Sequence, residues 1–117
     1  FEVYVKDGSH RDGGGMGDMS VWSLIAIGEM EGKGPTHRGI PIDSQHWFHS
    51  PELKPGQTIS FYTTLTSPDL RYTDADDYSR PVDVGDVFTR DPNVQIKVGM
   101  GVAEYPLGTM FYGPRIW

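Results

Sequence analysis

Val94-Gln-Ile-Lys-Val-Gly-Met-Gly-Val102 is the stretch that decides the predicted fold. Its apolar side chains alternate with polar residues or glycine along the whole segment. A period of two over this length is typical of a β-strand with one face toward a core. We therefore predict one continuous strand. The residues predicted to face the core are Val94, Ile96, Val98, Met100 and Val102.

Two further segments show the same alternation. Thr58–Leu65 follows the turn signal Lys54-Pro-Gly-Gln57, and proline followed by glycine is typical of a tight turn. The side chains predicted to share the inner face of this strand are Ile59, Phe61, Thr63 and Leu65. Near the start of the sequence, Phe1–Val5 predicts a strand with Phe1, Val3 and Val5 inward.

Ser20–Glu31 fits a helix or a strand by periodicity alone. Its β-branched and aromatic residues and its flanking glycines favour a strand. The predicted faces are Trp22, Leu24, Ala26 and Met30 on one side, and Val21, Ile25, Ile27, Glu29 and Glu31 on the other. Shorter strands are predicted at residues 46–48, 70–73, 87–89 and 109–112.

Length and composition restrict the architecture. With 117 residues the chain fits one domain, and its 15 glycines and 9 prolines indicate a turn-rich protein. About eight short strands separated by turn signals, without a convincing amphipathic helix, are typical of an antiparallel β-sandwich. We predict a single all-β domain over residues 1–117, jelly-roll-like, as a fragment of a larger chain.

Charge and residue usage exclude several functions. The formal net charge is −6 and no run of lysine and arginine occurs, which disfavours a nucleic-acid partner. The absence of cysteine excludes disulfides, thiolate nucleophiles and cysteine-ligated metal. No apolar run reaches the roughly 20 residues that a membrane-spanning helix needs.

The acidic segment that includes Asp74, Asp76 and Asp77 is a candidate metal site. Carboxylate oxygens are the ligands that calcium prefers, so Ca²⁺ is the cofactor that this segment predicts, if it binds one. The EF-hand spacing fails, because Ser79 and Gly85 stand where glycine and glutamate are required. Aspartate is also common in solvated turns, and that interpretation stays open.

Tyr72 and Tyr78 flank this segment and are candidate ligand-binding residues. Aromatic rings in carbohydrate-binding sandwiches stack against the C–H groups of sugars. Packing within the fold is the alternative. Glu29 and Glu31 would place two carboxylates on one strand face, as a glycoside hydrolase requires, but acid pairs on solvent faces are common. We predict no catalytic residues.

Five segments, taken in order, resemble one domain family. They are Val21–Ala26, Leu53–Thr66, Pro68–Thr73, Gly101–Phe111 and Pro114–Trp117. The family occurs in large secreted or cell-surface proteins of marine bacteria, diatoms and related algae. The resemblance implies an extracellular β-sandwich without known catalysis. It also implies that the family domain begins before Phe1 and continues after Trp117, so this chain would lack edge strands at both termini.

These observations together predict a non-enzymatic structural or adhesive module, extracellular or at the cell surface. Its expected partners are other protein chains or copies of itself, bound through sheet edges or faces. A calcium-assisted carbohydrate-binding module is the alternative, with glycans as partners, and a glycoside hydrolase is the third.

Overall fold

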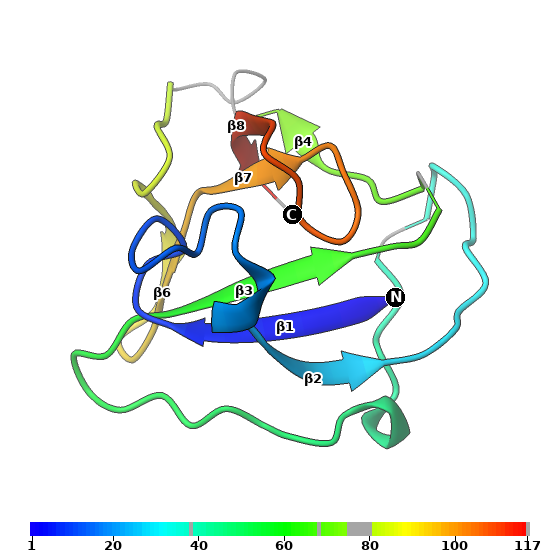
Figure 1. The fold of residues 1–117 in the computed structure, drawn as a ribbon, viewed down its shortest axis with the longest axis horizontal. Helices are drawn as coiled ribbons and strands as arrows, with labels where there is room; N and C mark the ends of the chain where they lie inside the picture. The colour runs from blue at the N-terminus through cyan, green and yellow to red at the C-terminus, as the bar shows by residue number, and fades with distance from the viewer. Residues whose placement is uncertain (38, 68, 75–80, 117) are drawn as a thin grey trace. The chain divides into compact units, whose positions relative to one another are not determined.

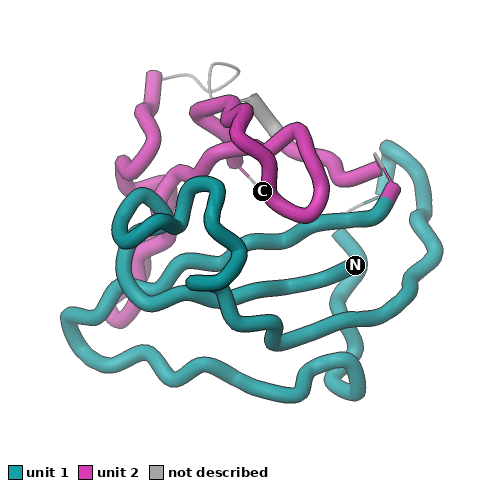
Figure 2. Tube along the Cα trace, viewed as in Figure 1, with its two compact units in different colours: residues 1–66 teal, residues 67–117 magenta. Residues whose placement is uncertain are grey.

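The computed structural model describes residues 1–37, 39–67, 69–74 and 81–116. The chain divides into two compact units, residues 1–66 and residues 67–117 (Figure 2). Every strand pair in the described ranges is antiparallel. The same ranges contain two short 3-10 helices, Met19–Val21 and Ser44–His46, and no α-helix. The predicted all-β, antiparallel class is therefore confirmed. No described helix is long and apolar enough to cross a membrane.

The first unit is built on a three-stranded sheet in the order β2-β1-β3 (Figure 1). Its strands are β1 (Glu2–Asp7), β2 (Ser23–Ile27) and β3 (Ile59–Thr64). The strand nearest the start of the sequence is thus the central one, with a neighbour on each side. The residue before this strand is anchored as well, because the amino group of Phe1 donates a 2.7 Å hydrogen bond to the carbonyl of Gly28.

Register assigns the side chains of this sheet to two faces. Val3 and Val5 of β1 lie opposite Thr63 and Phe61 of β3, while Tyr4 lies opposite Tyr62. Directly opposed residues of antiparallel strands share a face. Val3 and Val5 therefore lie on one face, and the Tyr4–Tyr62 pair lies on the other.

Side chains pack against both faces of this three-stranded sheet. On the first, Val3, Ile25 and Ala26 form a buried cluster, and the partly buried hydrophobic side chains packed against it are Phe1, Val5, Ile42 and Trp47. On the second, the rings of Tyr4 and Tyr62 stack at 5.8 Å, and Trp22 meets Tyr62 at 5.9 Å. A three-stranded sheet with apolar groups on both sides cannot show a simple inside-outside alternation.

Burial differs from the prediction in two strands of this unit. Phe61 is 54% exposed although it was predicted to face the core, whereas Thr64, on the opposite face of β3, is buried. In β2 the consecutive residues Ile25 and Ala26 are both buried. The register shifts between Val3 and Tyr4 of the paired strand, so one residue of β2 is unmatched and the alternation breaks.

The predicted strand over residues 20–31 is also longer than the one observed. Residues 19–21 form a 3-10 helix where the predicted strand was expected to begin, and β2 starts only at Ser23. The carboxylate of Asp18 caps this helix by accepting a 2.8 Å hydrogen bond from the backbone N–H of Ser20. Beyond Ile27 the chain leaves the sheet.

The second unit contains a three-stranded sheet in the order β4-β8-β7 and a separate two-stranded sheet, β5-β6. The strands are β4 (Thr73–Asp74), β5 (Val87–Arg90), β6 (Gln95–Lys97), β7 (Gly99–Val102) and β8 (Phe111–Ile116). The unit has its own core, in which Val98 and Ile116 are buried against the partly buried Val82 and Phe88. Of the short predicted strands, the one at 87–89 is confirmed, whereas those at 46–48, 70–73 and 109–112 are shifted or replaced.

The stretch predicted as one strand over 94–102 is two strands, and that prediction is wrong. β6 pairs with β5, whereas β7 pairs with β8. Between them Val98 exchanges hydrogen bonds with the turn before β5, donating to Asp86 and accepting from Gly85 at 2.9 Å each. The chain therefore changes partner at Val98. Because of this change Val94 and Ile96 are 45% and 57% exposed, although both were predicted to face the core.

Candidate binding surfaces

The predicted calcium site lies mainly outside the described residues. Asp76, Asp77 and Tyr78 belong to this excluded part, and Asp74 is described only through its backbone, which pairs with Arg115 of β8. Within the described ranges, no group of three His, Asp or Glu side chains could hold a metal ion. Calcium binding by this segment stays a prediction.

Tyr72, the described member of the predicted ligand-binding pair, is 50% exposed. The guanidinium carbon of Arg115 lies 4.8 Å from the centre of its ring. The pairing of β4 with β8 explains this contact, because Thr73 lies opposite Ile116 and brings Tyr72 to the end of β8. The contact is a cation–π interaction. One face of the ring is therefore occupied by the guanidinium group, and a stacked sugar would need the other.

The paired carboxylates predicted for a glycoside hydrolase do not share a strand. Glu29 and Glu31 are both exposed and follow the end of β2 at Ile27. The strand face that would have aligned them is therefore missing.

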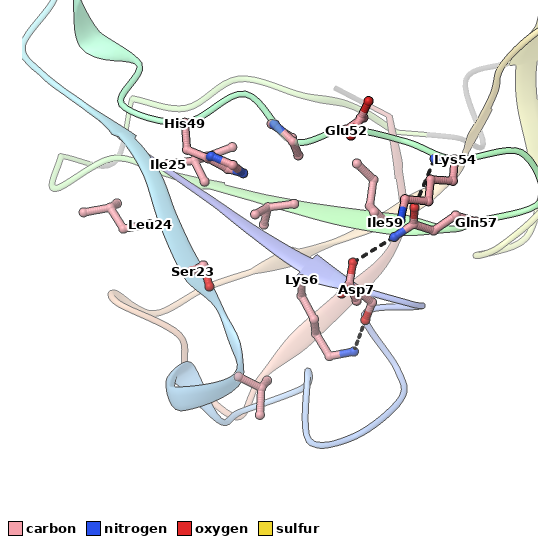
Figure 3. Close-up of a pocket in the computed structure, with 13 residues that line it drawn as sticks. Lys6, Asp7, Ser23, Leu24, Ile25, His49, Glu52, Lys54, Gln57 and Ile59 are labelled. Atoms are coloured by element: carbon pink, nitrogen blue, oxygen red, sulfur yellow. Dashed lines mark hydrogen bonds between the residues drawn. The ribbon is translucent and has the colours of Figure 1, made fainter.

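A groove of about 720 Å³ runs along the first unit, beside the sheet face that carries the core (Figure 3). Its aliphatic lining comes from the three strands and the 3-10 helix before β2, and comprises Val5, Val21, Leu24, Ile25 and Ile59. Its polar lining includes Asp7, His49, Glu52, Lys54 and Gln57. The loop of residues 49–57 supplies most of these polar groups and forms one wall of the groove.

This loop wall is attached to the sheet at both ends. At its start, the backbone N–H of Phe48 donates to the carbonyl of Ile25 at 3.0 Å, and Trp47 bridges to Ala26. At its end, the side chain of Gln57 makes two hydrogen bonds. Its Oε1 accepts from the N–H of Lys54 at 3.0 Å and its Nε2 donates to Asp7 Oδ1 at 3.1 Å (Figure 3).

The turn that precedes β3 places Gln57 at this end of the groove. The N–H of Gln57 bonds to the carbonyl of Lys54 at 3.0 Å, and Gly56 has a φ of 76°. Glycine reaches this left-handed conformation without strain. The turn predicted from Lys54-Pro-Gly-Gln57 is therefore confirmed.

The opposite face of the same sheet is covered by the glycine-rich segment that follows β1. The indole Nε1 of Trp22 donates to the carbonyl of Gly15 at 3.0 Å. A Cβ atom at Gly15 would lie 2.2 Å from the carbonyl oxygen of His10, so this position has no room for a side chain. Burial raises the pKa of the Tyr62 hydroxyl beneath this segment.

The outer edge of β3, on the side away from β1, is another candidate binding surface. β3 pairs with β1 through six consecutive residues without a bulge, and no strand in the described part of the chain pairs with its other side. Phe61 is 54% exposed in the middle of this strand. Within the described residues, the sheet of the first unit is thus bounded on this side by a regular strand with an exposed aromatic side chain.

No protein-family model, curated protein or solved structure matches this chain. The resemblance to the secreted domain family stays a prediction.

The sequence interpretation missed the groove. Asp7 and Gln57 are separated by 50 positions, and no spacing or motif links them. The signal that was present is the prediction of one strand over Phe1–Val5, which ends two residues before Asp7, and of another that begins at Thr58, directly after Gln57. Pairing of those two strands would have placed the two side chains together.

Proposed function

We propose that this chain is a non-catalytic structural or adhesive module that associates with copies of itself through the outer edge of β3. The observation that carries the proposal is an unbulged six-residue edge strand without a charged residue. Natural sheets protect their edges with charges, prolines, bulges or covering segments, because unpaired backbone groups invite another strand. β3 contains no charged residue, no proline and no bulge.

The backbone groups that β3 presents outward can be identified. The N–H of Gly8 donates to the carbonyl of Thr58 at 2.8 Å, so Thr58 directs its carbonyl toward β1. Backbone direction alternates along an antiparallel strand. Ile59, Phe61 and Thr63 therefore direct their N–H and carbonyl groups away from β1.

The other sheet edges are shorter, irregular or covered. The carbonyl of Ile25 in β2 accepts from Phe48, and Ala26 is bridged by Trp47. β4 has two residues, β6 has three residues and ends in Lys97, and the pairing of β7 shifts between Gly99 and Gly101. These features make β3 the edge best suited to strand addition.

A second copy fits this edge by symmetry. In an antiparallel pair related by a two-fold axis at Phe61, the Phe61 residues of the two copies lie opposite each other, and Ile59 lies opposite Thr63 of the partner. Opposed aromatic and β-branched side chains stabilise such pairs. No like charges meet, because residues 58–67 contain no charged residue.

The cellular setting belongs to the same proposal. An extracellular or cell-surface location, and a sandwich arrangement of the sheets, are supported by the resemblance to secreted domains. Because a two-fold pair is closed, association along this strand edge would join two such modules and so cross-link the longer chains that carry them in a surface layer, matrix or filament.

Sedimentation over a protein concentration series tests the proposal. We expect the weight-average mass of the unaltered protein to rise with concentration and the Thr63→Lys variant to remain monomeric, because lysine blocks strand edges. Thr66→Lys is the matched control, since Thr66 is exposed, follows β3 and undergoes the same charge change.

A second variant guards against loss of folding. Phe61→Thr introduces a β-branched residue, which suits a strand, and should weaken association by about tenfold, because a central aromatic contact is removed. An unaltered protein that stays monomeric throughout the series would contradict the proposal. Equal dissociation of Thr63→Lys and Thr66→Lys would contradict it as well.

A further inference from the structure

The groove of the first unit overlaps the contact proposed for self-association only at Ile59. Thr63 and Phe61, the two residues substituted to test that contact, do not line it. Its volume of about 720 Å³ lies within the roughly 300–1,000 Å³ typical of small-ligand sites. It therefore has the size of a site for a ligand of several rings.

The charges that line the groove balance one another. Asp7 and Glu52 are acidic, and Lys6 and Lys54 are basic. Lys6 is also engaged within the protein, since its Nζ donates to the carbonyls of Asp7 and Ser9 at 2.9 and 3.0 Å. A lining without excess charge favours a neutral ligand over a phosphorylated, sulfated or strongly basic one.

The side chains of Gln57 and Asp7 are held in place by hydrogen bonding before any ligand arrives. Gln57 is fixed by Lys54 at one end of its amide and by Asp7 at the other. Glu52 and His49, in the same loop, add an acceptor and an imidazole to the wall. Prior ordering of such groups lowers the entropic cost of binding a polar ligand.

The floor of the groove is aliphatic, with Val5, Leu24 and Ile59 contributed by the three strands of the sheet, since Ile25 is only 1% exposed. A ligand that fits both surfaces must present apolar C–H groups on one side and hydroxyl groups along its edge. We propose that this groove binds a neutral oligosaccharide, with Gln57, Asp7 and Glu52 hydrogen-bonding its hydroxyl groups and the aliphatic floor contacting its ring C–H groups.

A glycan array tests this assignment. The array carries three sets of oligosaccharides, built from neutral hexoses, from uronic acids and from sulfated sugars. It is probed with the Thr63→Lys variant, so that self-association cannot amplify weak contacts. We expect binding confined to the neutral set and unchanged by EDTA, because the groove contains no metal in this assignment.

Calorimetry with the best neutral oligosaccharide then locates the site. Gln57→Ala and Glu52→Gln should each lower affinity by about tenfold, the effect expected when one or two hydrogen bonds to the ligand are lost. Glu31→Gln is the matched control for Glu52→Gln, since Glu31 is exposed and does not line the groove. Thermal unfolding of each variant confirms that it is folded.

Three results would overturn the inference. The first is no binding of any neutral oligosaccharide by the unaltered chain or by Thr63→Lys. The second is preferential binding of sulfated or uronic-acid sugars. The third is binding that survives both groove substitutions but is lost with EDTA or in Tyr72→Ala, which would place it at the predicted acidic segment instead.

These results do not depend on the test of self-association. A chain that stays monomeric can still bind a sugar in the groove, and a chain that assembles through β3 can leave the groove empty. Failure of either proposal is therefore distinguishable from failure of the other.

Discussion

His10 follows β1 in the glycine-rich segment, and its Nε2 atom is buried without a hydrogen-bond partner among the described residues. Desolvation by this burial lowers the pKa of the imidazole below its ordinary value of 6.5, and the positive charges of Arg11 and Lys6 act in the same direction. The carboxylate of Asp12 opposes them. The folded protein therefore favours neutral His10.

We expect this histidine to make stability depend on pH. Because its pKa is lower in the folded than in the unfolded state, its neutral form supports folding above pH 6.5, and that support is lost as pH falls below 6.5. The unfolding temperature should drop between pH 7.5 and pH 5 by less in His10→Gln than in the unaltered protein, as measured by circular dichroism.

Two carboxylates with lowered pKa affect the stability of the protein in a different pH range. The side-chain hydrogen bond from Ser20, and then its backbone hydrogen bond, lower the pKa of Asp18 from 3.8. Backbone hydrogen bonds from Asn93 and Val94 lower the pKa of Asp91 from the same value. Their stabilisation is lost only below that value.

His37→Gln, a substitution of a histidine in an exposed segment, is the control for His10→Gln. If His10→Gln and the unaltered protein lose the same stability between pH 7.5 and pH 5, the argument fails.

At the scale of the element, β2 shows how a bulge changes what a short strand contributes. Ile25 is 1% exposed and Ala26 is fully buried, although they are neighbours. The register shift opposite them directs both toward the cluster around Val3. This short strand thus supplies two consecutive residues to the core of the first unit.

We predict that Ile25→Ala lowers the free energy of unfolding by about 2–5 kcal/mol, because it removes a buried side chain and leaves a cavity. Ile27→Ala is the matched control, since Ile27 lies in the same strand and is 45% exposed. Its cost should stay within about 1 kcal/mol. Urea denaturation measures both. Similar losses for the two variants would show that Ile25 is not the core residue of this strand.

At the scale of the whole molecule, the first unit contains one sheet and the second unit two, and each unit has its own buried cluster. The net charge of the chain is −6. Two copies that approach each other therefore repel, whereas the edge proposed to join them is uncharged. The balance between these two effects depends on salt.

We expect self-association to strengthen as ionic strength rises. Salt screens the repulsion between two copies but has little effect on backbone hydrogen bonds and apolar contacts. The dissociation constant measured by sedimentation should fall severalfold between about 0.05 M and 0.5 M NaCl. Weaker association at high salt would instead indicate a contact built on opposite charges.

The sequence by itself determined the antiparallel β class, because alternation of apolar residues and frequent turn residues are local properties. It also determined the Lys54–Gln57 turn and the uncharged character of β3. At the candidate sites, it drew attention to Tyr72 but gave no indication of the guanidinium that covers one side of its ring.

Only the tertiary structure decided which strands pair and which faces are buried. Register places Phe61 on the same face as Val5, but β3 is the outer strand of the first sheet, so the exposure of Phe61 could not be deduced from alternation. Every strand offers the same backbone groups, so nothing local shows that the chain changes partner at Val98. The groove exists because β1 and β3 pair in one register and bring Asp7 to Gln57 across 50 positions.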